Sequence, residues 1–146
     1  MLQPPPWDEI GQVVPHDHPQ ILNDQCVIRG VSEDHVARNK NPPRLASSLY
    51  QTSTCGNSPG MSVDHEPSML VDVIDLQARY QSGKWIGAVS LNVGFLRGLG
   101  FLVGYHPIEG NNYHCEVWGN ITGSLSNKIR NCATWFVPIE GVELKR

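Results

Sequence analysis

Apolar and polar residues alternate along residues 101–105 and again along 113–118, on either side of a loop rich in turn-forming residues. Alternation with a period of two is typical of β-strands, and proline, glycine and asparagine between two such runs are typical of a connecting turn. The pattern therefore predicts a β-hairpin over residues 101–119.

The second strand of this hairpin carries the residues with the most chemistry. Because successive side chains of a strand point to opposite faces, His114, Glu116 and Trp118 are expected on one face. The opposite face is more apolar and is expected to pack on the core; it carries Tyr113, Cys115 and Val117. This places His114 and Glu116 in solvent or in a cleft.

Further elements follow from the same patterns. Apolar residues recur at helical spacing between Pro67, suited to a helix start, and Gly83, suited to a helix end, which predicts a helix over 67–82. Shorter helices are predicted over 32–40, 92–98 and 123–133, and strands over 25–31, 44–50, 61–64, 85–89 and 135–139. A right-handed crossover through the helix over 92–98 would pair its two flanking strands in parallel.

The order of these elements predicts a single α+β domain. Its sheet is expected to be mixed, largely antiparallel and twisted, with two to four short helices. We place this domain at residues 25–146 and an extended, proline-rich arm at residues 1–24. Because the arm carries Trp7 and other apolar residues, residues 1–22 are a candidate surface for a homo-oligomer or a larger protein partner.

Composition narrows the class of protein. The chain has 146 residues, of which 40% are hydrophobic and 17% charged, as in a globular domain. A net charge of −3 disfavours non-specific binding of nucleic acid. No apolar run reaches the ~20 residues of a membrane helix, and residues 1–10 lack the features of a signal peptide. We therefore expect no membrane contact, a cytoplasmic location and four reduced cysteines.

His114 and Glu116 are the candidate catalytic pair. Adjacent residues on one face of a strand lie about 6–7 Å apart at the backbone, so an imidazole and a carboxylate there can act on one ligand as general acid and base. Trp118 is a candidate substrate-binding residue on the same face. The alternative is a solvent-facing sheet surface, with Trp118 covered by the arm or by a helix.

Arg29 is the only charge in the predicted strand over 25–31. A buried arginine needs a carboxylate or a phosphate as its partner, so Glu116 and a ligand phosphate are both candidates. The alternative is a structural ion pair.

Ser47 and Ser48 bring hydroxyl groups to the next predicted strand. Arginine, serine and glutamate on early, middle and late strands resemble the order found in ADP-ribosyltransferases of the Arg-Ser-Glu type. The resemblance covers three residues and their order. It implies that Arg29 would hold a dinucleotide phosphate, Ser47 or Ser48 would brace the site, and Glu116 would contact the nicotinamide ribose. His114 departs from the class, which usually has glutamine or glutamate two residues before the glutamate.

The remaining motifs do not identify a cofactor. His16 and His18, with Asp17 between them, could donate two ligands to zinc, but no spacing fixes a third, and we expect no metal site. The sequence contains no GxSxG, P-loop, HExxH or GxGxxG motif.

Two hypotheses for function remain. The first is a toxin-like or defence-associated enzyme that acts on a nucleotide-type (NAD-like) or RNA substrate, in a cleft formed by Arg29, Ser48, His114 and Glu116. The second is a non-catalytic interaction or assembly module that uses the N-terminal arm. A cleft that holds the four residues together favours the enzyme, whereas a core ion pair of Arg29 and a flat, open face around His114 favour the module.

Overall fold

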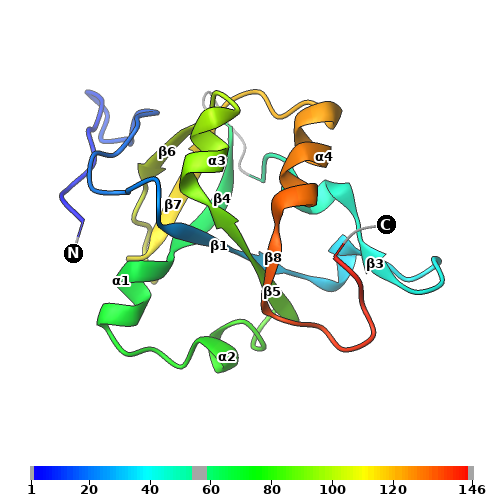
Figure 1. Ribbon diagram of the computed structural model, residues 1–146. Coiled ribbons are helices and arrows are strands. Elements are labelled where there is room, and N and C mark those ends of the chain that lie inside the picture. The colour runs from blue at the N-terminus through cyan, green and yellow to red at the C-terminus, as the bar shows by residue number, and fades with distance from the viewer. Residues whose placement is uncertain (1, 54–58, 145–146) are drawn as a thin grey trace.

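The centre of the molecule is an antiparallel β-sheet. The computed structural model describes residues 2–53 and 59–144, and within these residues the sheet has six strands (Figure 1). In spatial order they are β6 (Leu102–Tyr105), β7 (His114–Trp118), β4 (Gly60–His65), β1 (Cys26–Val31), β5 (Gly87–Asn92) and β8 (Thr134–Val137). Two short strands, β2 (Val36–Ala37) and β3 (Arg44–Leu45), pair separately. The predicted α+β class is confirmed.

The predicted hairpin is present. β6 and β7 pair antiparallel, with Val103 opposite Val117 and Gly104 opposite Glu116. The parallel pairing that a crossover through residues 92–98 would give is not formed, because β5 and β6 are not neighbours and every pair in the large sheet is antiparallel. The connection through α3 (Val93–Gly98) is shorter than the dozen or so residues that a parallel crossover needs.

The helices are short. The helix predicted over 67–82 is interrupted: α1 (Glu66–Val71) and α2 (Leu76–Arg79) are separate helices. Between them Val73 has a positive φ of 54°, and Asp75 caps α2 by accepting a hydrogen bond from the backbone N–H of Ala78. The predicted helix over 123–133 is present as α4 (Gly123–Cys132).

Two predicted elements near the N-terminus are corrected. Of the strand predicted over 44–50, only Arg44–Leu45 forms a strand, β3. Its later residues form the 3₁₀ helix η2 (Ser47–Tyr50). The helix predicted over 32–40 is reduced to the single 3₁₀ turn η1 (Glu33–His35).

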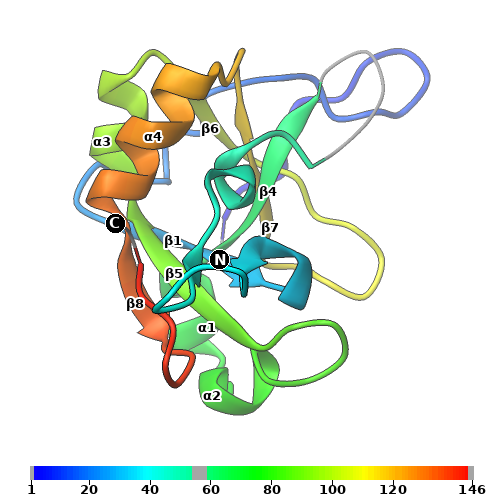
Figure 2. The ribbon, with the colours of Figure 1, turned by 90° about the vertical axis from the view of Figure 1, so that its right-hand side faces the viewer.

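The two faces of the sheet have different coverings. One face, which we call the α3–α4 face, holds the main core, including Val63, Cys115 and Val117, and α3 and α4 lie on this side (Figure 2). The other, which we call the histidine face, carries Ile28, on which Met69 of α1 and Tyr80, the residue after α2, pack. Strand register puts His114 and Glu116 on this second face.

The N-terminal segment divides into two parts. Its later part packs on the body: the N–H of His18 donates to the carbonyl of Val103, and Arg97 pairs with Asp17 at 2.8 Å. Ile21 is 1% exposed and belongs to the main core. The earlier part forms a turn closed by a bridge between Trp7 and Val13.

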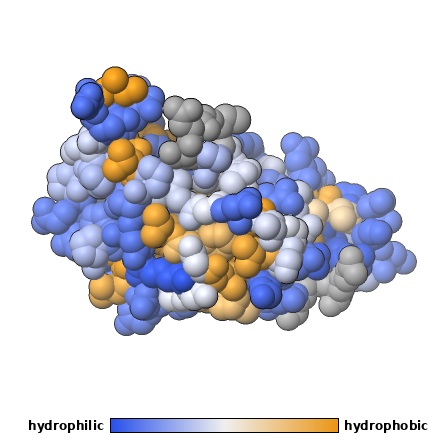
Figure 3. All heavy atoms as spheres, turned by 90° about the horizontal axis from the view of Figure 1, so that it is seen from above, coloured by the Kyte–Doolittle hydropathy of each residue, from blue (hydrophilic) through white to orange (hydrophobic). Residues whose placement is uncertain are grey.

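The outer surface is mixed in polarity. Apolar atoms gather in the middle of the face seen from above, with polar atoms around them (Figure 3). None of the helices in residues 2–53 and 59–144 combines the length and the apolar character needed to cross a lipid bilayer.

Candidate functional site

The site begins where β1 and β4 separate. Their ladder contains two residue pairs, Val27 with His65 and Ile28 with Asp64. The ladder ends there, and the side chain of Arg29, the next residue of β1, lies in the space between the two strands. Its Nη1 donates to the carbonyl of Ser62 at 2.8 Å, and its Nε donates to the carbonyl of Leu49 at 3.1 Å. The structure thus places a cation in a gap of the sheet.

A cleft of about 460 Å³ opens at this gap. This volume is in the range of small-molecule sites, about 300–1,000 Å³. Charged and polar side chains that line it come from β1, β4, α2, β7 and the segment before β5; they include Arg29, Ser62, Asp64, Arg79, Lys84 and His114. We call it the Arg29 cleft.

Arg29 is a buried cation that has no carboxylate partner among the described residues. It is 5% exposed, and no carboxylate in the described part of the chain lies within ion-pair distance of it. Burial lowers the pKa of Arg29 to about 10, and the charges of Glu116 and Asp64 oppose that shift. The residue therefore remains cationic near neutral pH. Its Nη2 has no acceptor among residues 2–53 and 59–144.

Two further cations face the same cleft. Lys84 places its Nζ 4.5 Å from the ring centre of Trp85, a cation–π contact. Arg79 donates to Asp64 and to the side-chain oxygen of Asn111, at 3.4 and 3.0 Å. Asp64 and Asp34, which also lines the cleft, offset two of these three positive charges, so the cleft keeps a net positive charge and favours an anionic ligand.

Three side chains next to the cleft form a compact group, which we call the His–His–Glu cluster: His106, His114 and Glu116. Oε1 of Glu116 lies 3.4 Å from Nε2 of His114 and 3.6 Å from Nδ1 of His106. The Nδ1 of His114 bonds the carbonyl of His106 at 2.6 Å. His114 lines the cleft, and Glu116 lies behind it without lining the cleft itself.

Burial dominates the electrostatics of this cluster. Glu116 is 1% exposed, and burial raises its pKa to about 7, with the hydroxyl of Ser62 and the charge of Arg29 acting in the opposite direction. Burial likewise lowers the pKa of His114 and that of His106. Oε2 of Glu116 and Nδ1 of His106 are buried and make no hydrogen bond within the described residues. Such unpaired buried atoms are uncommon in folded proteins.

Gly60 leaves room for the Glu116 carboxylate. It lies opposite Trp118 in the β4–β7 ladder, and a Cβ at this position would collide with Oε2 of Glu116.

The structure brings Arg29, His114 and Glu116 into one region but leaves the predicted serines outside it. Ser47 and Ser48 lie in η2, and neither lines the Arg29 cleft. Ser47 uses its carbonyl to accept a hydrogen bond from Ser126 of α4. The strand on which the Arg-Ser-Glu resemblance relied is absent here, so its serine has no counterpart at residues 47–48.

Ser62 takes the position next to the glutamate instead. Its hydroxyl donates to Oε1 of Glu116 at 3.2 Å. Ser62 lies opposite Glu116 in β4, and His106, the residue after β6, lies beside His114. Their proximity follows from the strand register, which the sequence pattern did not predict. No pattern in the sequence indicates that Lys84 belongs to the site.

Trp118 lies away from the Arg29 cleft. It is 6% exposed and packs against His16 of the N-terminal segment, with ring centres 5.2 Å apart. It lines a second, more open hollow of about 590 Å³ with Pro15 and Leu102. The structure thus shows the arm covering Trp118.

The arm histidines do not form a metal site. Both ring nitrogens of His16 are occupied, by the carbonyl of Val14 and the N–H of Tyr105. Both nitrogens of His18 also contact backbone groups.

Comparison with known proteins adds no assignment. No protein-family model, curated protein or solved structure matches the chain. Any proposal about function therefore rests on the geometry described above.

Proposed function

We propose that the protein is an enzyme that acts on a nucleotide-type small molecule, whose phosphate binds in the Arg29 cleft. The observation that carries this proposal is the buried Arg29, which lines the cleft without a carboxylate partner among the described residues. A buried guanidinium whose Nη2 has no acceptor in the described part of the chain is suited to a phosphate oxygen, because its N–H groups donate charge-assisted hydrogen bonds.

The dimensions and charge of the cleft support this ligand class. A volume of about 460 Å³ is suited to a small molecule rather than to a folded partner. Lys84 and Arg79 add positive charge, and the ring of Trp85 beside Lys84 offers an apolar surface for a base or a ribose.

The His–His–Glu cluster is the proposed reactive group. His114 is shared between the cluster and the cleft, so a ligand bound at Arg29 would lie next to it. A carboxylate and an imidazole in contact can transfer protons to and from a substrate. In this arrangement Glu116 acts through His114, because it does not line the cleft.

A binding and product screen tests the proposal. The full chain is titrated with inorganic phosphate, AMP, ADP, NAD, unphosphorylated adenosine and a short RNA, and each mixture is analysed for cleavage products. We expect phosphorylated compounds to bind and adenosine not to bind. Equal binding of adenosine and AMP, or binding of RNA alone, would overturn the proposed ligand class.

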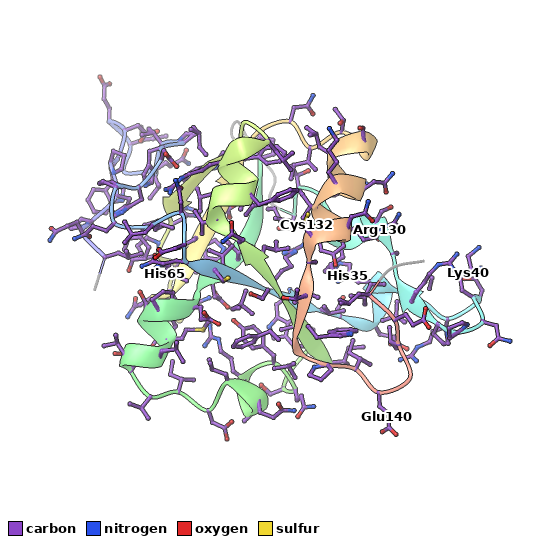
Figure 4. All side chains as sticks on the ribbon, viewed as in Figure 1. His35, Lys40, His65, Arg130, Cys132 and Glu140 are labelled. Atoms are coloured by element: carbon purple, nitrogen blue, oxygen red, sulfur yellow. The ribbon has the colours of Figure 1, made fainter. Side chains whose placement is uncertain are left out.

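Variants then separate binding from chemistry. Lys84→Ala should weaken nucleotide binding by about tenfold, since it removes a charge–phosphate contact. Lys40→Ala is the matched control, because Lys40 is exposed and lies on a distant loop (Figure 4). His114→Ala and Glu116→Gln should abolish product formation; product formation at the parent rate in both would refute the role of the cluster.

A second candidate function is favoured by the N-terminal turn. Trp7 is 54% and Ile10 78% exposed, so this turn presents apolar side chains to solvent. Such residues are suited to contact with a second copy or with another protein. Sedimentation analysis of Trp7→Ser/Ile10→Ser against the parent tests it, and an identical oligomeric state would exclude self-assembly through this turn.

A further inference from the structure

The His–His–Glu cluster has the composition and spacing of a metal site. His114 and Glu116 come from β7, and His106 directly follows β6, with its N–H donating to the carbonyl of His114 at 3.0 Å. The ligand atoms of the three side chains all lie within 4.8 Å of one another. A tetrahedral zinc ion with bonds of about 2.0–2.1 Å separates its donors by about 3.3 Å. The observed separations of 3.4 and 3.6 Å match this value.

Hydrogen bonding leaves this cluster with acceptors facing one another. The Nδ1 of His114 lies 2.6 Å from the carbonyl of His106, so it carries a proton and donates it. In the neutral ring the Nε2 lone pair then faces the Glu116 carboxylate, which is also an acceptor. Either a proton shared between them or a metal cation resolves this mismatch, and the spacing of the ligand atoms fits the metal cation. A backbone carbonyl that receives the other N–H is the usual arrangement for a metal-binding histidine.

Unpaired buried atoms supply a second observation. Nδ1 of His106 and Oε2 of Glu116 have no hydrogen-bond partner within residues 2–53 and 59–144. Glu116 is 1% exposed, so its carboxylate has little access to solvent as a substitute. Both atoms belong to the side chains that would coordinate the ion.

We propose that His106, His114 and Glu116 bind a divalent transition-metal ion, with Zn²⁺ as the best match. Two imidazoles and one carboxylate favour zinc over magnesium or calcium, which prefer oxygen ligands. Three protein ligands leave a position for water, as in catalytic zinc sites. Metal binding does not depend on the proposed nucleotide function; if both hold, the metal would lower the pKa of its bound water, and the resulting hydroxide would replace the carboxylate as the group that takes up a proton.

The test measures metal binding without an enzymatic assay. The full chain is treated with a chelator, dialysed and titrated with Zn²⁺ by calorimetry. Co²⁺ is titrated separately, and its visible absorption reports the coordination number. We expect one ion per chain and a four-coordinate Co²⁺ spectrum. Glu116→Gln and His106→Ala should each weaken binding by at least about 100-fold, since each removes a ligand.

Controls exclude other donors and unfolding. His35→Gln removes a histidine that lines the Arg29 cleft but lies outside the cluster, and Cys132→Ser removes an exposed thiol on α4 (Figure 4). Both should bind as the parent does. Because 31% of the His106 side chain is exposed, His106→Ala is expected to fold. The imidazole ¹⁵N shifts of the parent provide a readout that needs no variant, and they should change at His106 and His114 when Zn²⁺ is added.

Parent affinity in Glu116→Gln and His106→Ala, or unchanged imidazole shifts, would refute the site. That outcome would leave a simple His–Glu ion pair. Refutation of the metal site would leave the proposed nucleotide binding standing, because nucleotide binding is tested separately with Lys84→Ala.

Discussion

Single buried residues determine the environment of the candidate site. Gly60 is one of them, since a Cβ there would collide with the Glu116 carboxylate and Gly60 lies within an ordered strand. His65 is another: its Nδ1 lies 2.7 Å from the hydroxyl of Ser68 and its Nε2 lies 2.8 Å from the side-chain oxygen of Gln25.

Gly60→Ala should destabilise the protein by about 1–3 kcal/mol, because the added methyl group forces the Glu116 side chain or the strand to shift. Urea unfolding measures the change. Gly98→Ala is the control: a Cβ at this helical position meets nothing within 4 Å, and alanine favours helix by up to about 1 kcal/mol. Equal stability of Gly60→Ala and the parent would show that the carboxylate has room to move.

His65 should make stability depend on pH. Burial is the main reason that its pKa falls from 6.5 to about 4. The unfolded chain therefore binds this proton at a higher pH than the folded chain. Stability is complete above pH 6.5 and is lost as the pH falls towards 4, by at most about 1.4 kcal/mol per pH unit.

His65→Gln should reduce this slope, as measured by urea unfolding at several pH values between 4 and 7. His65 is the last residue of β4 and the N-cap of α1, and it lies beside the start of β1 (Figure 4). A slope identical to that of the parent would assign the pH dependence to other groups.

At the scale of elements, α2 is held to the sheet by a polar network centred on Asp64. Its carboxylate accepts from the hydroxyl of Tyr80 at 2.6 Å and from Asn111 at 2.8 Å, with Arg79 at 3.4 Å. The network joins α2, β4 and the β6–β7 loop, which border the Arg29 cleft. A helix of four residues would not be stable without such contacts.

Tyr80→Phe should cost about 2 kcal/mol, because a buried carboxylate loses a donor. Hydrogen exchange should show faster exchange in α2 and unchanged exchange in α4. Tyr113→Phe is the matched control, since Tyr113 also donates to a carboxylate, that of Asp72, but does so at the surface. We expect the control to change stability by less than about 0.5 kcal/mol; equal effects of the two substitutions would contradict the importance of burial.

At the scale of the whole molecule, the later part of the N-terminal segment packs on the body, whereas its earlier part is exposed. Ile21 lies in the main core, and Asp17 accepts the backbone N–H of Val103 on β6. Trp7 and Ile10 stand out from the body.

Removal of residues 1–22 should therefore destabilise the whole molecule, and Ile21→Ala alone should cost about 2–5 kcal/mol. Trp7→Ser/Ile10→Ser should change stability by less than about 0.5 kcal/mol. Thermal unfolding compares the three. If the chain without residues 1–22 were as stable as the parent, the segment would contribute nothing to the core.

The sequence by itself determined the hairpin and which of its residues share a face. Alternation predicted the hairpin and the separation of Cys115 and Val117 from His114 and Glu116, because side-chain direction along a strand depends only on position. It also predicted the α+β class. The prediction of one continuous helix over 67–82 was wrong, because the spacing of apolar residues does not reveal that Val73 adopts a positive φ.

Tertiary structure decided which residues meet. The position of Arg29 in a gap between β1 and β4 depends on where their ladder ends, and that is a property of the packed sheet. The approach of His106 to Glu116 depends on hairpin register, and the absence of Ser47 and Ser48 from the cleft depends on η2 packing against α4. Contacts between residues distant in sequence arise from the packing of whole elements, which local patterns of apolar and polar residues do not specify.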